Sequence, residues 1–500
     1  MPALCWWLSV FCVSLSPFIT QIIIGMLIFF AILGYFVVLL LVSRLATPKS
    51  DNDNFFRGHR RSRWPLVAFG MIGASISGVT FISVPGMVIT QQMTYLQTCL
   101  GFILGYLLVA FILLPVYYKL GLTTIYSYLR QRFGPSSYKT GAGFFLLSKM
   151  TGAAVRFFVV CFLLQHYLLD AYGVPFSLTV IVMVGLIWLY SRRGGIQTLV
   201  WTDTLQTFCM LTALVLILLA VMEQLHLSPA EAVAAIADDP HSRIFVMDDW
   251  MSTQNFWKQF VSGAFIVVVM TGLDQDMMQK NLTCRTLRDA QRDMCSYGLA
   301  FVPVNLLFLC LGVLLLHLAQ REGIAWPEQT DNLLPMFAAT GQLGRAVVVF
   351  FTVGVVAAGF SSADSALTAL TTSYCVDIRE RDDDERLRRR AHLMLAFIFA
   401  LCVIIFGYIR STNVLDAIYT LCSYTYGPLL GLFAYGLFTH RSTCDRMVPY
   451  VAIASPMVCF IVERVVGAMT GYHFGYESLL LNGCLTFLGL WIMGKSDKNH

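Results

Sequence analysis

The stretch from Gly354 to Ile378 places a carboxylate inside an otherwise apolar segment that is long enough to cross a bilayer. Its centre reads Ser361-Ser362-Ala363-Asp364-Ser365. Residues three or four positions apart share one face of a helix, so these oxygens would lie together. A carboxylate at bilayer depth is costly, and it persists where it meets a cation, a partner or water. The stretch therefore predicts a membrane-spanning helix with a cation-binding face, as in an ion-coupled transporter.

The composition is that of an integral membrane protein. Of the 500 residues, 57% are hydrophobic and only 13% are charged, and the mean hydropathy is +0.70. A soluble protein of this length needs more polar surface. Apolar segments of span length recur along the chain. We predict an all-α integral membrane protein with about thirteen transmembrane helices, near residues 21–43, 65–90, 96–119, 141–169, 175–191, 196–222, 257–275, 294–319, 346–376, 391–409, 413–439, 448–467 and 478–494.

The basic residues predict an orientation. Most of the 34 lysines and arginines fall in alternate connecting segments, of which 44–63 and 379–390 hold six each. Cytoplasmic loops carry such an excess, so we expect the N-terminus outside and the C-terminus in the cytoplasm of a plasma (inner) membrane. Residues 1–20 are apolar and lack the basic start of a signal peptide. They extend the first helix, or translation begins near Met26.

The segment 65–90 is an unusual span. Glycine, proline and hydroxyl residues interrupt it: Gly70, Gly73, Ser75, Ser77, Gly78, Thr80, Ser83, Pro85 and Gly86. A helix broken inside a membrane exposes carbonyls that need partners, so such breaks are tolerated where they line a cavity. Transporters use them to coordinate ions and substrate near the midplane. The alternative is close packing through small residues, which explains the glycines but explains the hydroxyls less well.

Three further stretches complete a pattern. They are RGGIQTLVWTDTLQ at 193–206, GLDQDMMQK at 272–280 and YGPLLGLFAYGLFT at 426–439. With NFFRG at 54–58, GASISG at 73–78 and SSADS at 361–365, their order and spacing resemble the sodium/solute symporter family. That family includes proline, galactose and sialic-acid symporters and the glucose and iodide carriers. The resemblance covers roughly residues 21–495.

The resemblance implies a fold of ten core helices in two inverted five-helix repeats with a broken first core helix. The repeats would be residues 65–222 and 257–439, joined by an external loop at 223–256. Residues 1–64 would supply one leading helix. Residues 440–500 would supply two trailing helices and a cytoplasmic tail. The thirteen helices and the orientation that charge predicts agree with this arrangement.

The resemblance also implies a sodium site. Its ligands would be the carbonyls of Gly73 and Ile76 on the broken helix and the carbonyl of Ala358 on the eighth core helix. The hydroxyls of Ser361 and Ser362 would complete it.

Some members of the family bind a second sodium ion through the aspartate of a W-T-D motif, which is Asp203 here. Its partners would be the hydroxyls of Ser361 and Ser365 and the residue at 364. This chain departs from the pattern, because Asp364 stands where those members carry serine. The change could strengthen cation binding, replace sodium by a proton, or pair with a basic residue. Asp203 could instead belong to an intracellular exit path or act as a buried acceptor between helices.

The substrate candidates are Ser75, Ser77, Thr80 and Arg156. Arg156 falls near mid-membrane, where a charge needs a partner. A guanidinium binds a carboxylate bidentately, and an arginine on the equivalent helix of sialic-acid symporters resembles this one and contacts the substrate's carboxylate. The alternative is an ion pair with Asp203 or Asp364. Ser75 stands where proline symporters have an aspartate, which weakens a proline assignment.

Other residues receive lesser roles. Phe81, Gln92 and residues near Phe260 are weaker substrate candidates. Lys149 is interpreted as structural, with its amine snorkelling to the cytoplasmic surface. The charged residues of the 272–280 motif, Asp274, Asp276 and Lys280, are predicted to sit where a helix meets the cytoplasm, as gating or loop contacts.

Together these features predict a sodium-coupled symporter that imports a small polar organic solute by alternating access. If Arg156 is a ligand, the solute is a sugar acid, a sialic acid or an amino acid; if not, a neutral sugar or polyol with proton or sodium coupling is favoured equally. The partners expected are the solute, sodium ions and membrane lipid, with no nucleic acid, no metal but sodium and no cofactor. We recognise no set of catalytic residues in the sequence, so we do not expect an enzyme. A sensor of the same fold, or a channel or uniporter, is the rival class.

Overall fold

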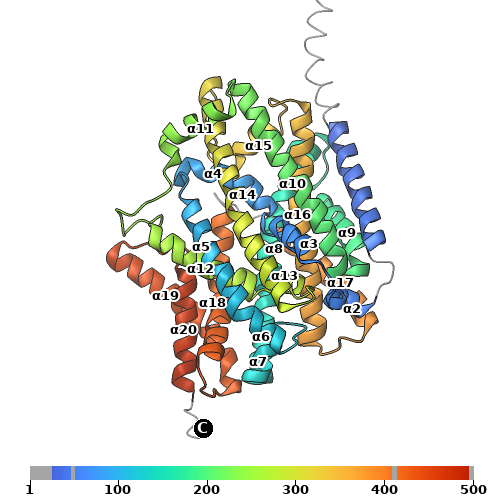
Figure 1. Ribbon diagram of the computed structural model, residues 1–500, viewed down its shortest axis with the longest axis vertical. Helices are drawn as coiled ribbons and strands as arrows, with labels where there is room; N and C mark the ends of the chain where they lie inside the picture. Colours follow the sequence, from blue (N-terminus) through green and yellow to red (C-terminus); the bar gives the residue numbers. More distant parts are fainter. Residues whose placement is uncertain (1–24, 47–50, 408–413, 495–500) are drawn as a thin grey trace, which may run out of the picture.

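The computed structural model describes residues 25–46, 51–407 and 414–494, and these fold into a bundle of helices (Figure 1). Among the described residues, nine helices are long and apolar enough to cross a membrane, or up to eleven if each of two bent pairs is one span. Each of the predicted segments coincides with a helix or a bent pair, but the count of thirteen spans stays a prediction. The alternatives for residues 1–20 lie outside the described residues.

The described helices have the following bounds: Gly25–Ala46, α2 (Asn52–Arg57), α3 (Trp64–Ser75), α4 (Gly78–Gln91), α5 (Tyr95–Leu108), α6 (Leu114–Lys119), α7 (Ser127–Arg132), α8 (Pro135–Leu164), α9 (Phe176–Gly194), α10 (Ile196–Leu225), α11 (Pro229–Asp238), α12 (Phe256–Val267), α13 (Gln275–Asn281), α14 (Leu287–Glu322), α15 (Leu333–Ala338), α16 (Arg345–Ser373), α17 (Glu385–Phe406), α18 (Val414–Phe438), α19 (Val448–Thr470) and α20 (Ser478–Met493). In Figure 1, α3, α8, α10 and α16 lie in the middle of the bundle, with α19 and α20 at one side and the helix Gly25–Ala46 at the other.

The first core helix is broken, as predicted. The axes of α3 and α4 are bent by 57°. Ile76 leaves the helical region with a ψ of 76°, and the Ser77 N–H donates to the Ser75 carbonyl, only two residues back, at 2.9 Å. The glycines on either side of the break lower the cost of leaving the helix at this point.

A second bend was not predicted. A π-helical turn at Val268–Gly272 extends α12, and α13 then turns away from it by 70°. The Asp274 side chain caps α13 by accepting from the Asp276 N–H at 2.8 Å. Every residue of α13 is buried. Asp274, Asp276 and Lys280 are thus inside the protein rather than in a solvated loop, and their position where a helix meets the cytoplasm stays a prediction.

Close packing joins the broken helix to its neighbours. A Cβ atom at Gly73 would lie 2.0 Å from Thr207 Oγ1 on α10, and one at Gly78 would lie 2.5 Å from Val160 Cγ2 on α8. Gly78 also faces α16, where its Cβ would be 3.7 Å from the Gly359 amide nitrogen. The break between α3 and α4 is thus enclosed by α8, α10 and α16. The segment 223–256 contains the short helix α11, which begins at a capping box of Ser228 and Glu231.

Candidate functional site

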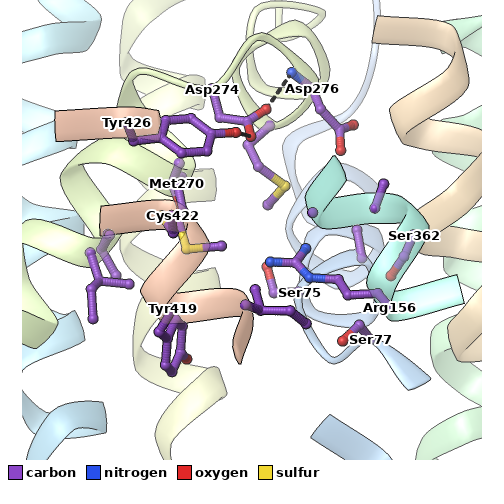
Figure 2. A pocket seen from close by; sticks show the side chains of 18 of the residues that line it. Ser75, Ser77, Arg156, Met270, Asp274, Asp276, Ser362, Tyr419, Cys422 and Tyr426 are labelled. Atoms are coloured by element: carbon purple, nitrogen blue, oxygen red, sulfur yellow. Dashed lines mark hydrogen bonds between the residues drawn. The ribbon is translucent and has the colours of Figure 1, made fainter. Parts of the chain in front are cut away.

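A cavity of about 100 Å³ lies at the break between α3 and α4 (Figure 2). By the same measure a single water needs about 10–15 Å³, so the cavity has room for a small organic solute. Its wall is built from the broken helix, α5, α8, α12 with its π-helical turn, the 272–280 motif, α14, α16 and α18. The polar or aromatic residues used below are Ser75, Ser77, Thr80, Lys149, Arg156, Asp274, Asp276, Tyr297, Ser362, Tyr419 and Tyr426.

Arg156 is a half-buried cation on this wall. Figure 2 shows its guanidinium extending into the cavity beside Ser75. Among the described residues it makes no hydrogen bond or ion pair. The alternative that Arg156 pairs with Asp203 or Asp364 is therefore wrong, because those carboxylates have other partners.

The three other substrate candidates come together with Arg156. Ser75, Ser77 and Thr80 all line the cavity, and the Ser75 hydroxyl shares a short hydrogen bond with the Tyr297 hydroxyl. Gln92, by contrast, donates to the Pro240 carbonyl at 3.3 Å outside the cavity. The Phe81 ring packs against Phe308 and Phe351, with centroids 5.2 and 6.1 Å away. That the solute binds to Ser75, Ser77, Thr80 and Arg156 stays a proposal.

A buried ion cluster forms the next part of the wall. Lys149 Nζ lies 3.1 Å from Asp274 Oδ2 and 2.7 Å from Asp276 Oδ2. The Tyr426 hydroxyl donates to the same Asp274 oxygen at 2.6 Å. The Lys149 side chain is only 9% exposed. The prediction that it snorkels to the cytoplasmic surface is therefore wrong: two carboxylates hold its amine inside the protein.

The oxygen-rich face of α16 lies beside the break. Ser362 lines the cavity with Ser75 and Ser77, and Ser361 points to Asp203 on α10. The side-chain oxygens Ser362 Oγ, Ser365 Oγ and Asp364 Oδ1 are buried without a hydrogen-bond partner among the described residues. An unpaired buried polar group costs about 1–3 kcal/mol. Hydroxyl and carboxylate oxygens in this state suit a hard cation, so the residues fit a sodium ion.

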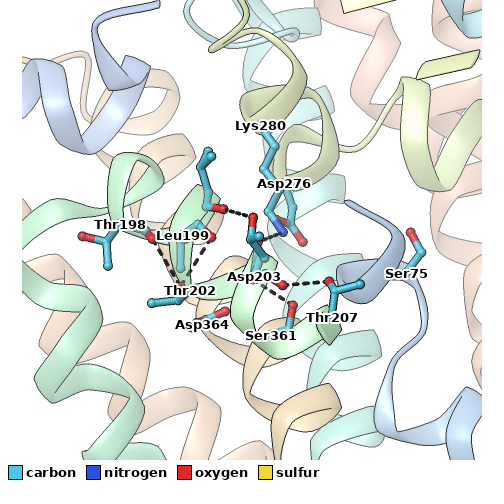
Figure 3. A network of polar contacts seen from close by, with 12 residues as sticks. Ser75, Thr198, Leu199, Thr202, Asp203, Thr207, Asp276, Lys280, Ser361 and Asp364 are labelled. Atoms are coloured by element: carbon cyan, nitrogen blue, oxygen red, sulfur yellow. Dashed lines mark hydrogen bonds and ion pairs between the residues drawn. The ribbon is translucent and has the colours of Figure 1, made fainter. Parts of the chain in front are cut away.

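Asp203 is the centre of a second polar network (Figure 3). Ser361 Oγ donates to Asp203 Oδ1 at 2.8 Å, and Lys280 Nζ lies 2.8 Å from Asp203 Oδ2. Asp364 belongs to the neighbouring turn of α16, where it accepts a short hydrogen bond from the Tyr190 hydroxyl. The sequence does not predict Lys280 as the partner of Asp203, because the two residues belong to separate motifs and only the tertiary fold brings them together.

A broken helix that lines a cavity beside an oxygen-rich helix, within a bundle of membrane-length helices, defines a secondary transporter. The model of the sodium:solute symporter family matches residues 55–445, so the chain belongs to this family. It is a multi-pass membrane protein, and its relatives are transporters rather than enzymes, as the sequence predicted.

Two curated relatives give the range of similarity. The chain is 22% identical to the sodium/sialic acid symporter SiaT of Proteus mirabilis, over 92% of this chain and 95% of the relative. It is 26% identical to the human sodium/iodide cotransporter over 77% of this chain, and it spans only 61% of that protein.

Solved structures show the same fold. A sodium-coupled sialic acid symporter in a substrate-bound outward-open state matches with a TM-score of 0.80 at 19% identity, over 94% of this chain and 99% of that one. Mhp1, a nucleobase-cation-symport-1 family transporter in a closed conformation, matches with a TM-score of 0.58 at 15% identity, over 88% and 93%. The predicted fold class is confirmed, and the boundaries of the two repeats stay a prediction.

The contact between Gly73 and Thr207 predicts a steric effect at the break. Gly73→Ala would place its Cβ within 3.1 Å of the Thr207 backbone as well as its side chain. We expect a loss of about 1–3 kcal/mol, the usual cost of overpacking, measured by thermal or denaturant unfolding in detergent. Gly143→Ala on α8 is the control, because nothing lies within 4 Å of its Cβ. Equal stability of the two variants would contradict the close approach of α3 and α10.

Proposed function

We propose that this protein is a sodium-coupled symporter that imports a small organic solute bearing a carboxylate, such as a sugar acid, a sialic acid or an amino acid, by alternating access. The observation that carries the proposal is Arg156, a cation on the cavity wall with no hydrogen bond or ion pair among the described residues. A charge at this depth needs a partner. A bound carboxylate would supply one in bidentate geometry. The sialic acid symporters among the relatives support this class of solute.

Sodium would bind between the broken helix and α16. The proposed ligands are the carbonyls of Gly73, Ile76 and Ala358 and the hydroxyls of Ser361 and Ser362. Ser362 supports this most directly, because its buried hydroxyl lacks a partner among the described residues and also faces the solute cavity. An ion held there would stabilise the arrangement of α3, α4 and α16 that binds solute, which is a coupling free energy between two sites. The membrane potential adds about 2.3 kcal/mol per charge per 100 mV.

The proposed setting is a plasma (inner) membrane, with the N-terminus outside and the C-terminus in the cytoplasm. The partners are the solute, sodium and lipid, and sodium acts as coupling ion rather than as a cofactor. No nucleic acid takes part.

A neutral sugar or polyol is the second candidate solute. Asp274 and Asp276 line the same cavity as Arg156, and carboxylates accept hydrogen bonds from sugar hydroxyls. A neutral solute would leave Arg156 without a direct ion pair, with only the more distant charge of Asp276 to balance it, which is why the carboxylate is favoured. The same carrier could couple a neutral solute to sodium or to protons.

Thermal unfolding in sodium chloride against choline chloride tests the sodium site. A ligand that binds only the folded state stabilises it by RT ln(1+[L]/Kd). Ser362→Ala is expected to raise the sodium concentration needed for this effect by about 10-fold to 100-fold, because a hydrogen-bond-type contact to a charge contributes about 1.5–3 kcal/mol. Uptake of radiolabelled solute into proteoliposomes under a sodium gradient should fall in parallel.

Thr352→Val is the matched control on α16. Its hydroxyl donates to the Val348 carbonyl one turn back at 2.8 Å, so its loss should leave the sodium response unchanged. Identical unfolding of the wild-type protein in sodium and in choline, with each of the candidate acids and sugars, would rule out the sodium site.

A further inference from the structure

We propose that the ammonium group of Lys280 occupies the position beside Asp203 where a second sodium ion would bind, so that this carrier binds a single sodium ion. The inference rests on the proposed sodium coupling and specifies its stoichiometry. It concerns the second cation site that the family resemblance implies, formed by Asp203, Asp364 and Ser365.

Both carboxylate oxygens of Asp203 already have partners. The ammonium of Lys280 lies 2.8 Å from Oδ2, and the Ser361 hydroxyl donates to Oδ1 at 2.8 Å. The side chains of Lys280 and Asp203 are 2% and 1% exposed. Figure 3 shows Lys280 reaching from α13 to Asp203 on α10, beside Ser361 on α16. An ammonium at this distance takes the position that a monovalent cation bound to Oδ2 would take.

The position of Lys280 is fixed by the packing of α13. The neighbouring Gln279 amide donates to the Phe56 carbonyl at 2.9 Å and to Thr372 Oγ1 on α16 at 3.0 Å. Asp276 Oδ1, one turn earlier on α13, lies 3.9 Å from the same Lys280 amine. These contacts of α13 with the core keep the Lys280 side chain buried.

Charge balance leads to the same conclusion. A buried carboxylate is stable when one opposite charge and its hydrogen bonds satisfy it, and Lys280 supplies that charge to Asp203. A sodium ion on Asp203 would meet the repulsion of the ammonium in a region of low dielectric. The side-chain oxygens beside Asp203 that remain without a hydrogen-bond partner among the described residues and are not assigned to the first sodium site are Asp364 Oδ1, Ser365 Oγ and Thr368 Oγ1, all on α16. The Asp203 carboxylate does not join them as a ligand, because it pairs with Lys280.

Removing Lys280 should open the position to a second sodium ion. The test is a sodium titration of the thermal stability of the purified full-length protein, at constant ionic strength with choline. Stabilisation by one site rises with RT ln[L] above Kd, so two sites give twice the slope of melting temperature against log sodium concentration. We expect the slope of Lys280→Met to be about twice that of the wild-type protein, with lower stability in choline alone.

Two variants are matched controls. Lys280→Arg keeps the cation, and we expect the wild-type slope. The double variant Asp203→Asn with Lys280→Met removes both charges of the pair, so it should fold better than Lys280→Met alone and also keep the wild-type slope. If Lys280→Met does not fold even in high sodium, the test is the Hill coefficient of the sodium response of the wild-type protein. A Hill coefficient near 1 supports the inference.

The outcomes separate the two proposals. A wild-type Hill coefficient near 2, or a slope that does not increase in folded Lys280→Met, would overturn the role of Lys280 while leaving sodium coupling intact. If the stability of the wild-type protein does not respond to sodium at all, both the proposed function and this inference are overturned.

Discussion

Replacing Arg156 with glutamine is expected to raise the KM for a carboxylate solute by about 30-fold to more than 1,000-fold. Truncating one partner of a buried charge pair costs about 2–5 kcal/mol, and each 1.4 kcal/mol is about tenfold in affinity. The variant should remain folded, because Arg156 makes no ion pair among the described residues in the absence of solute. Arg156→Lys keeps the charge but loses the bidentate geometry, so its effect should be smaller.

The measurement is sodium-driven uptake into proteoliposomes of an acid and of its uncharged amide. If Arg156 binds the carboxylate, Arg156→Gln should lose the preference for the acid and keep any residual transport of the amide. Arg130→Gln is the control, because this arginine is exposed and pairs with Glu380 at 3.1 Å, away from the cavity. Unchanged acid uptake by Arg156→Gln, or an equal loss for acid and amide, would contradict a carboxylate contact.

The features that the sequence could predict are those imposed by the bilayer and by the local backbone. A membrane span requires a long apolar segment, so the positions of the helices follow from hydropathy alone. The break near Ile76 could be predicted because glycines and hydroxyls interrupt an apolar segment where an uninterrupted helix would otherwise form. Arg156 could be identified as exceptional for the same reason: the cost of a charge at mid-membrane is a property of its depth.

The ion pairs could not be predicted in this way, since they depend on a tertiary bend. Asp274 lies 125 residues from Lys149 in the chain, and only the 70° turn into α13 brings the two together. Charged residues at the end of an apolar segment are usually solvated, so the sequence gives no sign that Asp274, Asp276 and Lys280 are buried in ion pairs. The same reasoning assigned Lys149 to the surface. The expectation for Lys149 is wrong because it considers each charge alone, whereas opposite charges that meet inside a protein stabilise one another.

Loss of Lys149 should destabilise the protein strongly. Lys149→Met would leave Asp274 and Asp276 without their shared cation at a site where the lysine side chain is only 9% exposed. Removing one partner of a buried ion pair costs about 3–5 kcal/mol. The Tyr426 hydroxyl would still donate to Asp274, but Asp276 would keep only the Lys280 amine, at 3.9 Å, and the more distant charge of Arg156. The midpoint of denaturant unfolding in detergent, and the free energy derived from it, measure the effect.

Lys139→Met is the matched control, since this lysine also belongs to α8 and also pairs with a carboxylate, Glu380 at 3.4 Å, but its side chain is 53% exposed. Exposed ion pairs contribute about 0–1 kcal/mol, so this variant should unfold almost like the wild-type protein. Adding Asp276→Asn to Lys149→Met removes one of the unpaired carboxylates and should recover part of the lost stability. Equal losses for the two lysine variants, or no recovery in the double variant, would show that the cost comes from lost packing rather than from buried charge. In that case the cluster on the cavity wall would not hold the 272–280 motif against α8 by electrostatics.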